Sequence, residues 1–389
     1  MIIQLLVVLG ALVIGARYGS LALGAISGIG LAILVFGFQL KPGTPPTDVI
    51  YIIIAAVTCA GVLQASGGMD WMIQIAERLL RKHPDRITLL APLTTFLLTV
   101  MVGTGHVVYT LMPIICDIAL KKGIRPERPC GIASIASQIG ITCSPISAAV
   151  VAFSSISALN GFNISNVQVI MVTIPACLLG ILAAVAYSWH RGKDLDKDPA
   201  FQAKLKDPKQ FAYIYGGSAS TLDKQISKEN KRAVYIFLAA LLIIVIFSFC
   251  TMAGHNILPA WNEVEVVKGG PATVTLANGA TESAKQLAKA GVVVAGVTQS
   301  VPKHLSMNLV IQIMMITAAA LMVIFCKAKP KAAVSGAVWQ NGMVAVVAIY
   351  GIAWMCDTYF SNYTSEMNVM LSGIVERYPW SMAFVFFLV

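Results

Sequence analysis

Long apolar stretches recur along the whole chain and are separated by short polar segments. A helix that crosses a bilayer needs about 20 predominantly apolar residues. Several stretches reach or approach that length, and we predict a spanning helix in each of them: 2–16, 20–38, 49–66, 131–156, 168–189, 233–252, 308–326 and 336–356. The pattern predicts an all-α polytopic membrane protein.

One further apolar stretch, 87–120, is too long for a single span. As one helix it would measure about 50 Å, against a hydrocarbon core of about 30 Å. The sequence Gly103-Thr104-Gly105-His106 interrupts it and leaves two short arms. The stretch therefore forms either two tight spans or a re-entrant hairpin whose tip lies inside the membrane.

Composition excludes several classes of protein. Of the 389 residues, 57% are hydrophobic and only 12% are charged, whereas soluble domains carry about 25% charged residues. This excludes a cytosolic enzyme, a disordered chain and a nucleic-acid-binding protein, and it leaves the lipid bilayer as the surroundings. The eight cysteines form no Cys-x-x-Cys pair, which favours packing among helices over a metal site or a disulfide framework.

The distribution of basic residues predicts the orientation in the membrane. We let the chain start outside, turn at each span and return through 87–120 to the side that it left. The cytoplasmic segments then hold 22 of the 28 lysines and arginines, ten of them between residues 190 and 232. The positive-inside rule requires such an excess, so we predict an external N-terminus.

Two polar segments divide the chain. Residues 190–232 alternate in charge and predict a cytoplasmic, partly helical linker between an N-terminal membrane half, 1–189, and a C-terminal half, 233–389. Residues 254–305 predict an external insertion, to which we assign no function. Within it, VEVV and TVTL alternate like a β-hairpin around Gly-Gly-Pro, and ESAKQLAKA predicts one helix.

Two amphipathic segments match each other and indicate an internal repeat. MIQIAERLLRKHP and NVMLSGIVERYP each follow two predicted spans and end at a proline, Pro84 or Pro379. The charge distribution places the first inside and the second outside, as in the inverted repeats of secondary transporters, although two such helices can also coincide by chance. A second hairpin tip at the same offset beyond Pro379 falls past Val389. We therefore expect a truncated chain without the second hairpin and the helices after it.

Two interruptions of apolar helices offer a site for a small anion. The N-terminal end of a helix carries roughly half a positive charge and exposes N–H groups, which a membrane tolerates only inside protein or at a wet cavity. One interruption is the hairpin tip, and the other is Ser-Pro-Ile-Ser within the broken helix 131–156. The predicted substrate-binding residues are Thr104, Gly105, His106, Thr142, Ser144, Pro145 and Ser147. Neither stretch carries a full charge, which suits a substrate held by dipoles and hydroxyls; the alternative is that both are kinks and packing points.

No motif for covalent or metal chemistry accompanies these residues. The sequence contains no nucleophile–base pair, metal-ligand cluster or phosphate-binding loop, so we expect no enzymatic activity, no metal and no cofactor. For His106 a neutral hydrogen-bonding role is favoured over a proton relay. The sequence from Gly24 to Gly28 resembles a Gly-x-x-x-Gly face and predicts close helix packing.

Several motifs together resemble one transporter family. The stretches LQASGGMDWMIQIAERLLRKHP, GTGHVVYTLMPI, IRPERP, ITCSPISAAVV, RGKDLDKD and YGIAWMCDT are similar to the anaerobic C4-dicarboxylate transporters, the Dcu family, over nearly all of the chain. The resemblance implies exchange or uptake of fumarate, succinate, malate and aspartate across the bacterial inner membrane. It also implies the wider ion-transporter superfamily, with inverted repeats, two re-entrant hairpins and elevator-type homodimers.

The resemblance implies that the superfamily's substrate site is present in this sequence, although some of its residues differ. Its Ser/Thr-rich tip matches Thr104, Gly105 and His106, and its unwound helix matches the segment from Thr142 to Ser147. Gly103 stands where sodium-coupled relatives carry an asparagine, which argues against a sodium site, and the coupling ion, H⁺ or Na⁺, stays open. The superfamily's second hairpin and second unwound helix are absent from the sequence.

Three kinds of function are compatible with these features. The first is a dicarboxylate carrier with alternating access. The second, a carrier of a different anion or a cation/proton antiporter, predicts carboxylates at mid-membrane, which we do not find. The third is a membrane-bound sensor or interaction partner, or an inert truncated product, and it follows from the missing half-site. We favour the first.

Overall fold

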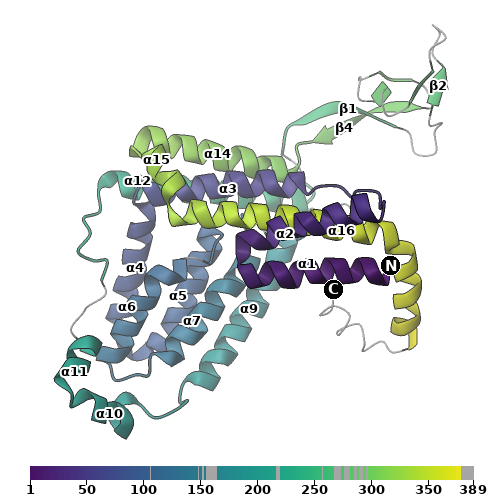
Figure 1. Ribbon diagram of the computed structural model, residues 1–389. Helices are drawn as coiled ribbons and strands as arrows, with labels where there is room; N and C mark the ends of the chain where they lie inside the picture. Colours follow the sequence, from purple (N-terminus) through teal and green to yellow (C-terminus); the bar gives the residue numbers. More distant parts are fainter. Residues whose placement is uncertain are drawn as a thin grey trace.

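The computed structural model describes residues 1–105, 107–147, 149–150, 153–154, 164–215, 220–255, 257–266, 273–275, 281–283, 287–288, 292–294 and 297–377. Most of these residues are helical (Figure 1). Within this described part, six helices are long and apolar enough to cross a membrane, and Ile2–Tyr18 and Leu21–Gly37 are shorter apolar helices. The helical polytopic architecture predicted from the apolar stretches is confirmed.

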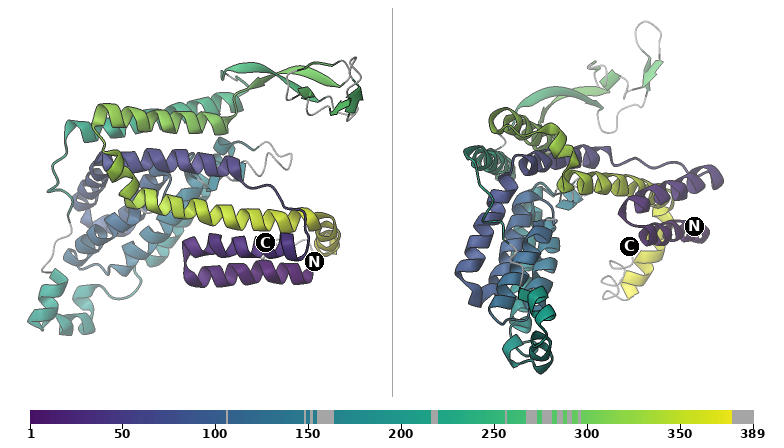
Figure 2. Two further views of the ribbon diagram at one scale, coloured as in Figure 1. Left: turned by 45° about the horizontal axis from the view of Figure 1, so that its top comes forward. Right: turned by 60° about the vertical axis from the view of Figure 1, so that its left-hand side comes forward.

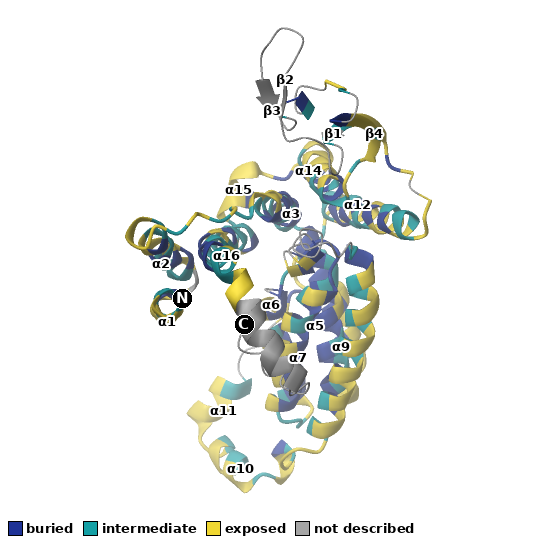
Figure 3. Cartoon of the chain, turned by 90° about the vertical axis from the view of Figure 1, so that its right-hand side faces the viewer, coloured by how far each residue is buried: buried dark blue, intermediate teal, exposed yellow. Residues whose placement is uncertain are grey.

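A first group of helices runs side by side and is seen end-on in Figure 3. Its members come from the two ends of the chain: α1 (Ile2–Tyr18), α2 (Ser20–Ala32, continued by the π-helical turn η1, Ile33–Gly37), α3 (Thr47–Ala65), α14 (Met307–Cys326) and α16 (Ala337–Arg377). The helix α12 (Lys228–Met252) packs against α14, and α15 (Pro330–Ser335) precedes α16.

The helix α16 is longer than the sequence pattern indicated. The predicted span from Ala337 onward and the described part of the amphipathic segment after it, up to Arg377, form one continuous helix of 41 residues. The residues between them contain no glycine or proline, so nothing in the local sequence ends the helix after the span.

The helices α2 and α16 approach closely at two glycines. A Cβ atom on Gly24 would fall on the backbone of Val347, and one on Gly351 would fall on the backbone of Gly24. Gly28 has open space at the same position. The small-residue packing predicted for this segment is therefore confirmed at Gly24, whereas Gly28 makes no such contact.

The helices α3 and α16 pack antiparallel to each other. Gly61, late in α3, lies against Trp339 at the start of α16, and Ile53, earlier in α3, clusters with Val346 further along. In Figure 1, α14 lies beside α3 and runs in the same direction.

A second group of helices runs across the first (Figures 1 and 3). Its members are consecutive in the sequence: α4 (Gly68–Lys82), the 3₁₀ turn η2 (Pro84–Arg86), α5 (Ile87–Val102), α6 (Val107–Lys121), α7 (Glu127–Gly140) and α9 (Asn166–Ser188). The helices α5 and α6 pack against each other, so the stretch 87–120 is a helical hairpin. The lengths of its arms fit two tight spans as well as a re-entrant hairpin.

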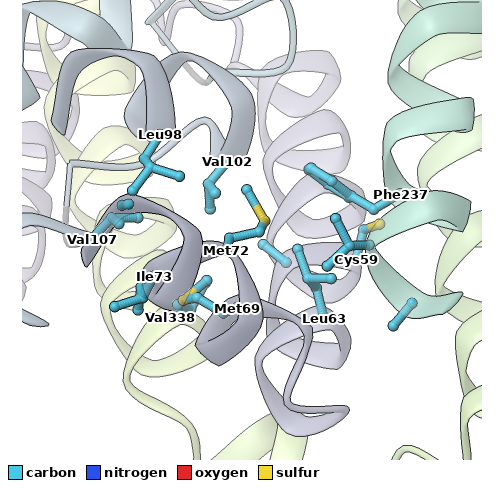
Figure 4. Close-up of a cluster of buried hydrophobic side chains, with 14 of the residues drawn as sticks. Cys59, Leu63, Met69, Met72, Ile73, Leu98, Val102, Val107, Phe237 and Val338 are labelled. Carbon is cyan, nitrogen blue, oxygen red and sulfur yellow. The ribbon is translucent and has the colours of Figure 1, made fainter. Parts of the chain in front are cut away.

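One hydrophobic core joins the two groups. Figure 4 shows side chains of α3, α4, α5 and α12 that converge there, among them Leu63, Met72, Val102 and Phe237. All four are buried. Because lipid is as apolar as these side chains, close packing rather than exclusion from water stabilises the contact inside a membrane.

The linker is anchored where it leaves α9. Arg128 of α7 donates hydrogen bonds to the carbonyl oxygens of Trp189, Arg191 and Gly192, and it pairs with Asp194 at 2.8 Å. Short helices follow, as expected: η4 (Leu195–Lys197), α10 (Pro199–Leu205) and α11 (Pro208–Tyr215). These helices and the strands of the insertion lie at opposite ends of the molecule in both views of Figure 2.

The described residues of the insertion form two short antiparallel strand pairs. The strand β1 (Ala260–Val266) pairs with β4 (Thr298–His304), and β2 (Thr273–Thr275) pairs with β3 (Thr281–Ser283). The predicted hairpin of VEVV with TVTL is therefore wrong. Alternation marks a strand but not its partner, and β1 meets β4 because α12 and α14, which flank the insertion, pack side by side.

The helix predicted over ESAKQLAKA begins too early. Glu282 and Ser283 belong to β3, whereas Leu287 and Ala288 are helical. The other residues of this segment lie outside the described part of the chain. The pairing of β3 with β2 overrides the helical preference of its first residues.

Candidate functional site

The hairpin tip begins where α5 ends at a left-handed glycine. Gly103 has a φ of 78°, and its N–H donates to the carbonyl oxygen of Thr99 at 2.8 Å. Glycine adopts this conformation without strain, which makes it a frequent helix end. Thr104 and Gly105 follow, and His106 lies outside the described residues. The tip therefore adjoins the N-terminal end of α6, where helical N–H groups lack partners within the helix.

The second interruption follows α7 directly. A 3₁₀ turn, η3 (Ile141–Cys143), leads into Ser144, whose backbone is extended with φ −94° and ψ 128°. The hydroxyl of Ser147 accepts a hydrogen bond from the N–H of Val150 at 3.3 Å and caps the helical turn that resumes there. The helix predicted over 131–156 is thus broken at the Ser-Pro-Ile-Ser segment.

Hydroxyl groups fasten the tip to α7. Ser137 Oγ donates to the carbonyl oxygen of Gly105 at 2.7 Å and lies 2.9 Å from Thr99 Oγ1. Gly140 allows the helices to approach here, because a Cβ at that position would lie 3.1 Å from the Thr99 side chain. Thr99 and Ser137 are fully buried. The position of the tip is therefore determined by α5 and α7 together.

A cavity of about 230 Å³ lies between these interruptions and the first group of helices. The tip and the break after α7 form one wall, and α3 and α16 form the other. None of the described lining residues is ionisable: Ile53, Ala56, Val57, Ala60, Val102, Gly103, Thr104, Gly105, Gln138, Ile141, Ile146, Val338, Asn341, Gly342 and Ala345. Sites for drug-sized ligands measure about 300–1,000 Å³, so this cavity suits a smaller molecule.

The cavity lies against the middle of α3. That helix has 19 residues and is a candidate span, so it measures about 28 Å. Its lining residues fall between Ile53 and Ala60, several residues from either end. Across a membrane that α3 spans, the cavity therefore lies at about half depth.

The structure brings several of the predicted residues to this cavity. Thr104 and Gly105 line it. Ser144 lies directly behind Gly103, because a Cβ on that glycine would be 3.4 Å from Ser144 Oγ. The Ser144 side chain is fully buried, and its hydroxyl has no hydrogen-bond partner among the described residues. A buried hydroxyl without a partner is costly, which makes Ser144 an unusual residue directly behind the cavity wall.

Other predicted residues do not line the cavity. Pro145 and Ser147 are buried within the break. Thr142 is exposed on the side of α9: its hydroxyl donates to the carbonyl oxygen of Ile139 at 2.7 Å, and its own carbonyl accepts from Thr173 at 3.0 Å.

Sequence reasoning missed two amides that line the cavity. Gln138 of α7 lies close to the tip, since a Cβ on Gly105 would be 3.0 Å from its Nε2. Asn341 of α16 lines the opposite wall. Gln138 could have been identified from the sequence, because it is an amide side chain inside a predicted apolar span. No local motif joins Asn341 to the tip, because it lies in the other half of the chain.

A second polar cluster fixes the end of the linker to α4. The Glu77 side chain is fully buried, and its carboxylate accepts hydrogen bonds from the backbone and hydroxyl of Thr221 and from the hydroxyl of Ser220. Arg81 pairs with it at 2.8 Å. Burial opposes ionisation of this carboxyl, but the hydrogen bonds outweigh burial and hold the pKa of Glu77 below its ordinary value.

The helices and the cavity define the class of protein and, with the comparisons, the family. In the described part of the chain, helices of spanning length in two packed groups form a helical polytopic membrane protein. The chain belongs to the family of anaerobic C4-dicarboxylate membrane transporters, whose model matches residues 1–389. Since this is a family of transporters and not of enzymes, the resemblance and the expectation of a non-enzyme are both confirmed.

Individual relatives are similar over almost the whole chain. The chain is 42% identical over 390 residues to the anaerobic C4-dicarboxylate transporter DcuB of Escherichia coli O6:H1, covering 100% of this chain and 78% of that protein. It is 30% identical over 388 residues to the C4-dicarboxylate transporter DcuA of Wolinella succinogenes, covering 100% and 78%. It is 31% identical over 385 residues to DcuA of Helicobacter pylori J99, covering 99% and 76%. No solved structure matches it.

Proposed function

We propose that this protein is a secondary transporter that exchanges or takes up C4-dicarboxylates such as fumarate, succinate, malate and aspartate. Its family membership and the names of its relatives support this function. The cavity beside the hairpin tip and the break after α7 supports the location of the substrate site. Its size suits a small molecule such as a four-carbon diacid.

In this proposal, neutral groups hold both carboxylates. Thr104 and the N-terminal end of α6 bind one of them, because the positive end of the helix dipole and exposed N–H groups attract anions. The Ser144 hydroxyl gains the hydrogen-bond partner that it lacks among the described residues. The amides of Gln138 and Asn341 donate to the other carboxylate from opposite walls. With no cation among the described lining residues, the diacid is bound weakly enough to be released.

The two walls of the cavity suggest how access alternates. The group α4–α9 supplies the tip and the break, and α3 and α16 supply the opposite wall. We propose that the group α4–α9 moves past α3 and α16 in an elevator-type transition within a homodimer. Cross-linking Ile146→Cys to Ala345→Cys, which line opposite walls and are not assigned to the substrate, is then expected to stop exchange, and unchanged exchange after complete cross-linking would rule out this movement.

The packing pattern supports an inverted repeat. The helices α2 and α16 form one close pair, and α3 and α14 form another. A two-fold relation that exchanges α2 with α14 and α3 with α16 maps each pair onto the other, and it requires the antiparallel packing of α3 and α16 described above. We propose 1–189 and 233–389 as the two membrane halves, with 190–232 as the linker.

We further propose that the protein resides in the bacterial inner membrane with its N-terminus outside. The described parts of the linker and of the insertion lie at opposite ends of the molecule (Figure 2), as the charge distribution requires. A membrane-impermeant thiol reagent should label Glu263→Cys in intact cells but label Lys209→Cys only after permeabilisation. The reverse labelling would invert the topology.

Fumarate–succinate counterflow in proteoliposomes tests the function. Vesicles that contain the chain and unlabelled succinate should accumulate labelled fumarate, and the E. coli relative DcuB serves as the assay control. Dependence of the initial rate on Na⁺ or on a pH gradient identifies the coupling ion. Absence of counterflow with this chain under conditions in which DcuB exchanges would contradict the proposal.

A further inference from the structure

A second hollow of about 310 Å³ lies outside the cavity, where α4, α5 and α12 meet. Its described lining is apolar apart from Thr94, the Tyr235 hydroxyl and the indole N–H of Trp71. Ile75 and Leu79 of α4 and Leu97 of α5 expose 48%, 44% and 57% of their surface here. The hollow is therefore an open apolar groove rather than part of the core.

One end of this groove has the residues of a membrane–water boundary. Trp71 and Tyr235, which both line it, stack edge to face with ring centroids 5.6 Å apart. Tryptophan and tyrosine are enriched at membrane interfaces. The apolar part of α12 is preceded, beside Tyr235, by the basic residues Lys228, Lys231 and Arg232. The groove thus begins at the side of the membrane that carries the basic residues.

Two basic side chains lie along the edge of this groove. Lys231 Nζ lies 5.9 Å from the centroid of the Trp71 ring, and its side chain is exposed. Arg78 is exposed on α4 between the lining residues Ile75 and Leu79 and donates to Gln74 at 3.5 Å. Of the carboxylates near this rim, Asp70 pairs with Lys224 and Glu77 with Arg81, and Glu229 of α12 interacts with Lys327 and Arg232. The rim therefore presents net positive charge beside an apolar surface.

From this combination we infer that the groove is a binding site for an anionic phospholipid. An acyl chain lies along Ile75, Leu79 and Leu97, and the phosphate group meets Lys231 and Arg78. Charge complementarity selects the lipid, because each basic residue near an anionic membrane surface strengthens the attraction about fivefold. The inference does not depend on the transported substrate, since the groove and the cavity have no lining residue in common.

Quenching of Trp71 fluorescence by brominated lipids tests this site directly. The full chain is reconstituted in mixed vesicles of phosphatidylglycerol and phosphatidylcholine in which one or the other lipid carries brominated acyl chains. The signal of Trp71 is the difference between the parent and Trp71→Phe, which leaves the other tryptophans in place. We expect brominated phosphatidylglycerol to occupy the groove about fivefold to thirtyfold in preference to brominated phosphatidylcholine.

Charge variants separate a specific site from general attraction to a basic protein. In the double variant Lys231→Gln and Arg78→Gln the preference should fall to about one, whereas Lys204→Gln with Lys209→Gln removes the same charge from the linker and should leave it unchanged. Equal quenching by the two lipids in the parent would overturn the inference. So would an equal loss of preference in both double variants. Absence of quenching by either lipid would mean that protein, such as a second copy of the chain, covers the groove.

Discussion

Ser144 is a buried hydroxyl without a partner among the described residues, and its removal distinguishes binding from structural support. In Ser144→Ala we expect the Kd for fumarate to rise about tenfold or more, because a hydrogen bond to a charged group contributes about 1.5–3 kcal/mol. The midpoint of thermal unfolding without substrate should stay unchanged or rise, since a costly unpaired group is gone.

The matched control for this change is Ser248→Ala. Ser248 of α12 is also buried without a partner among the described residues, but it does not adjoin the hairpin tip, and α12 contributes no residue to the described cavity lining. Its replacement should leave the affinity for fumarate unchanged. If Ser144→Ala lowered the unfolding midpoint and left the affinity intact, Ser144 would be a packing residue.

Glu77 gives a prediction with a defined pH direction. Its pKa is lower in the folded protein than in the unfolded chain, so its contribution to stability is present above its ordinary pKa and is lost as the pH falls through the lowered value. The protection factor of the Thr221 amide, which corrects for the slower intrinsic exchange at low pH, should therefore fall on acidification. In Glu77→Gln the protection factor should be roughly tenfold smaller at neutral pH and depend less on pH.

The control for the linker is Asp223→Asn, an exposed carboxylate in the same segment. Its exchange profile should match that of the parent. Equal acceleration by both substitutions would mean that general charge, rather than the Glu77 carboxylate, holds the linker on α4.

At the scale of elements, the contact of α2 with α16 depends on Gly24 and Gly351. Gly24→Ala should lower the free energy of unfolding in detergent by about 1–3 kcal/mol, because the new methyl group falls on the backbone of α16. Gly28→Ala adds the same methyl group in open space on the same helix and should be neutral or slightly stabilising. Equal effects of the two changes would contradict this packing.

Helices were predictable from the sequence because twenty apolar residues in a row have few alternatives in a bilayer. The breaks at Gly103 and Ser144 were also predictable, because glycine and proline act through local backbone geometry. Strand partners in the insertion were not, since pairing of β1 with β4 depends on how α12 and α14 pack. The length of α16 was not predictable either, because the helix continues beyond the end of the predicted span.

At the scale of the whole molecule, the sequence predicted one wall of the cavity better than the other. Thr104 and Gly105 lie in a short interrupted motif, whereas Asn341 reaches the cavity only because α16 packs antiparallel to α3. Thr142 lies in the predicted motif, but the turn η3 directs it toward α9. Local patterns therefore identify the broken helices, and tertiary packing decides which of their side chains meet.

The central claim is that the tip and α16 enclose a single dicarboxylate site. Protection from a membrane-permeant maleimide by fumarate tests it most directly, with separate Thr104→Cys, Asn341→Cys and Thr142→Cys chains and modification at each site read by mass spectrometry. We predict that fumarate slows modification at positions 104 and 341, on opposite walls, but not at position 142, and that acetate protects none of them. Equal modification rates with and without fumarate at positions 104 and 341 would contradict the claim.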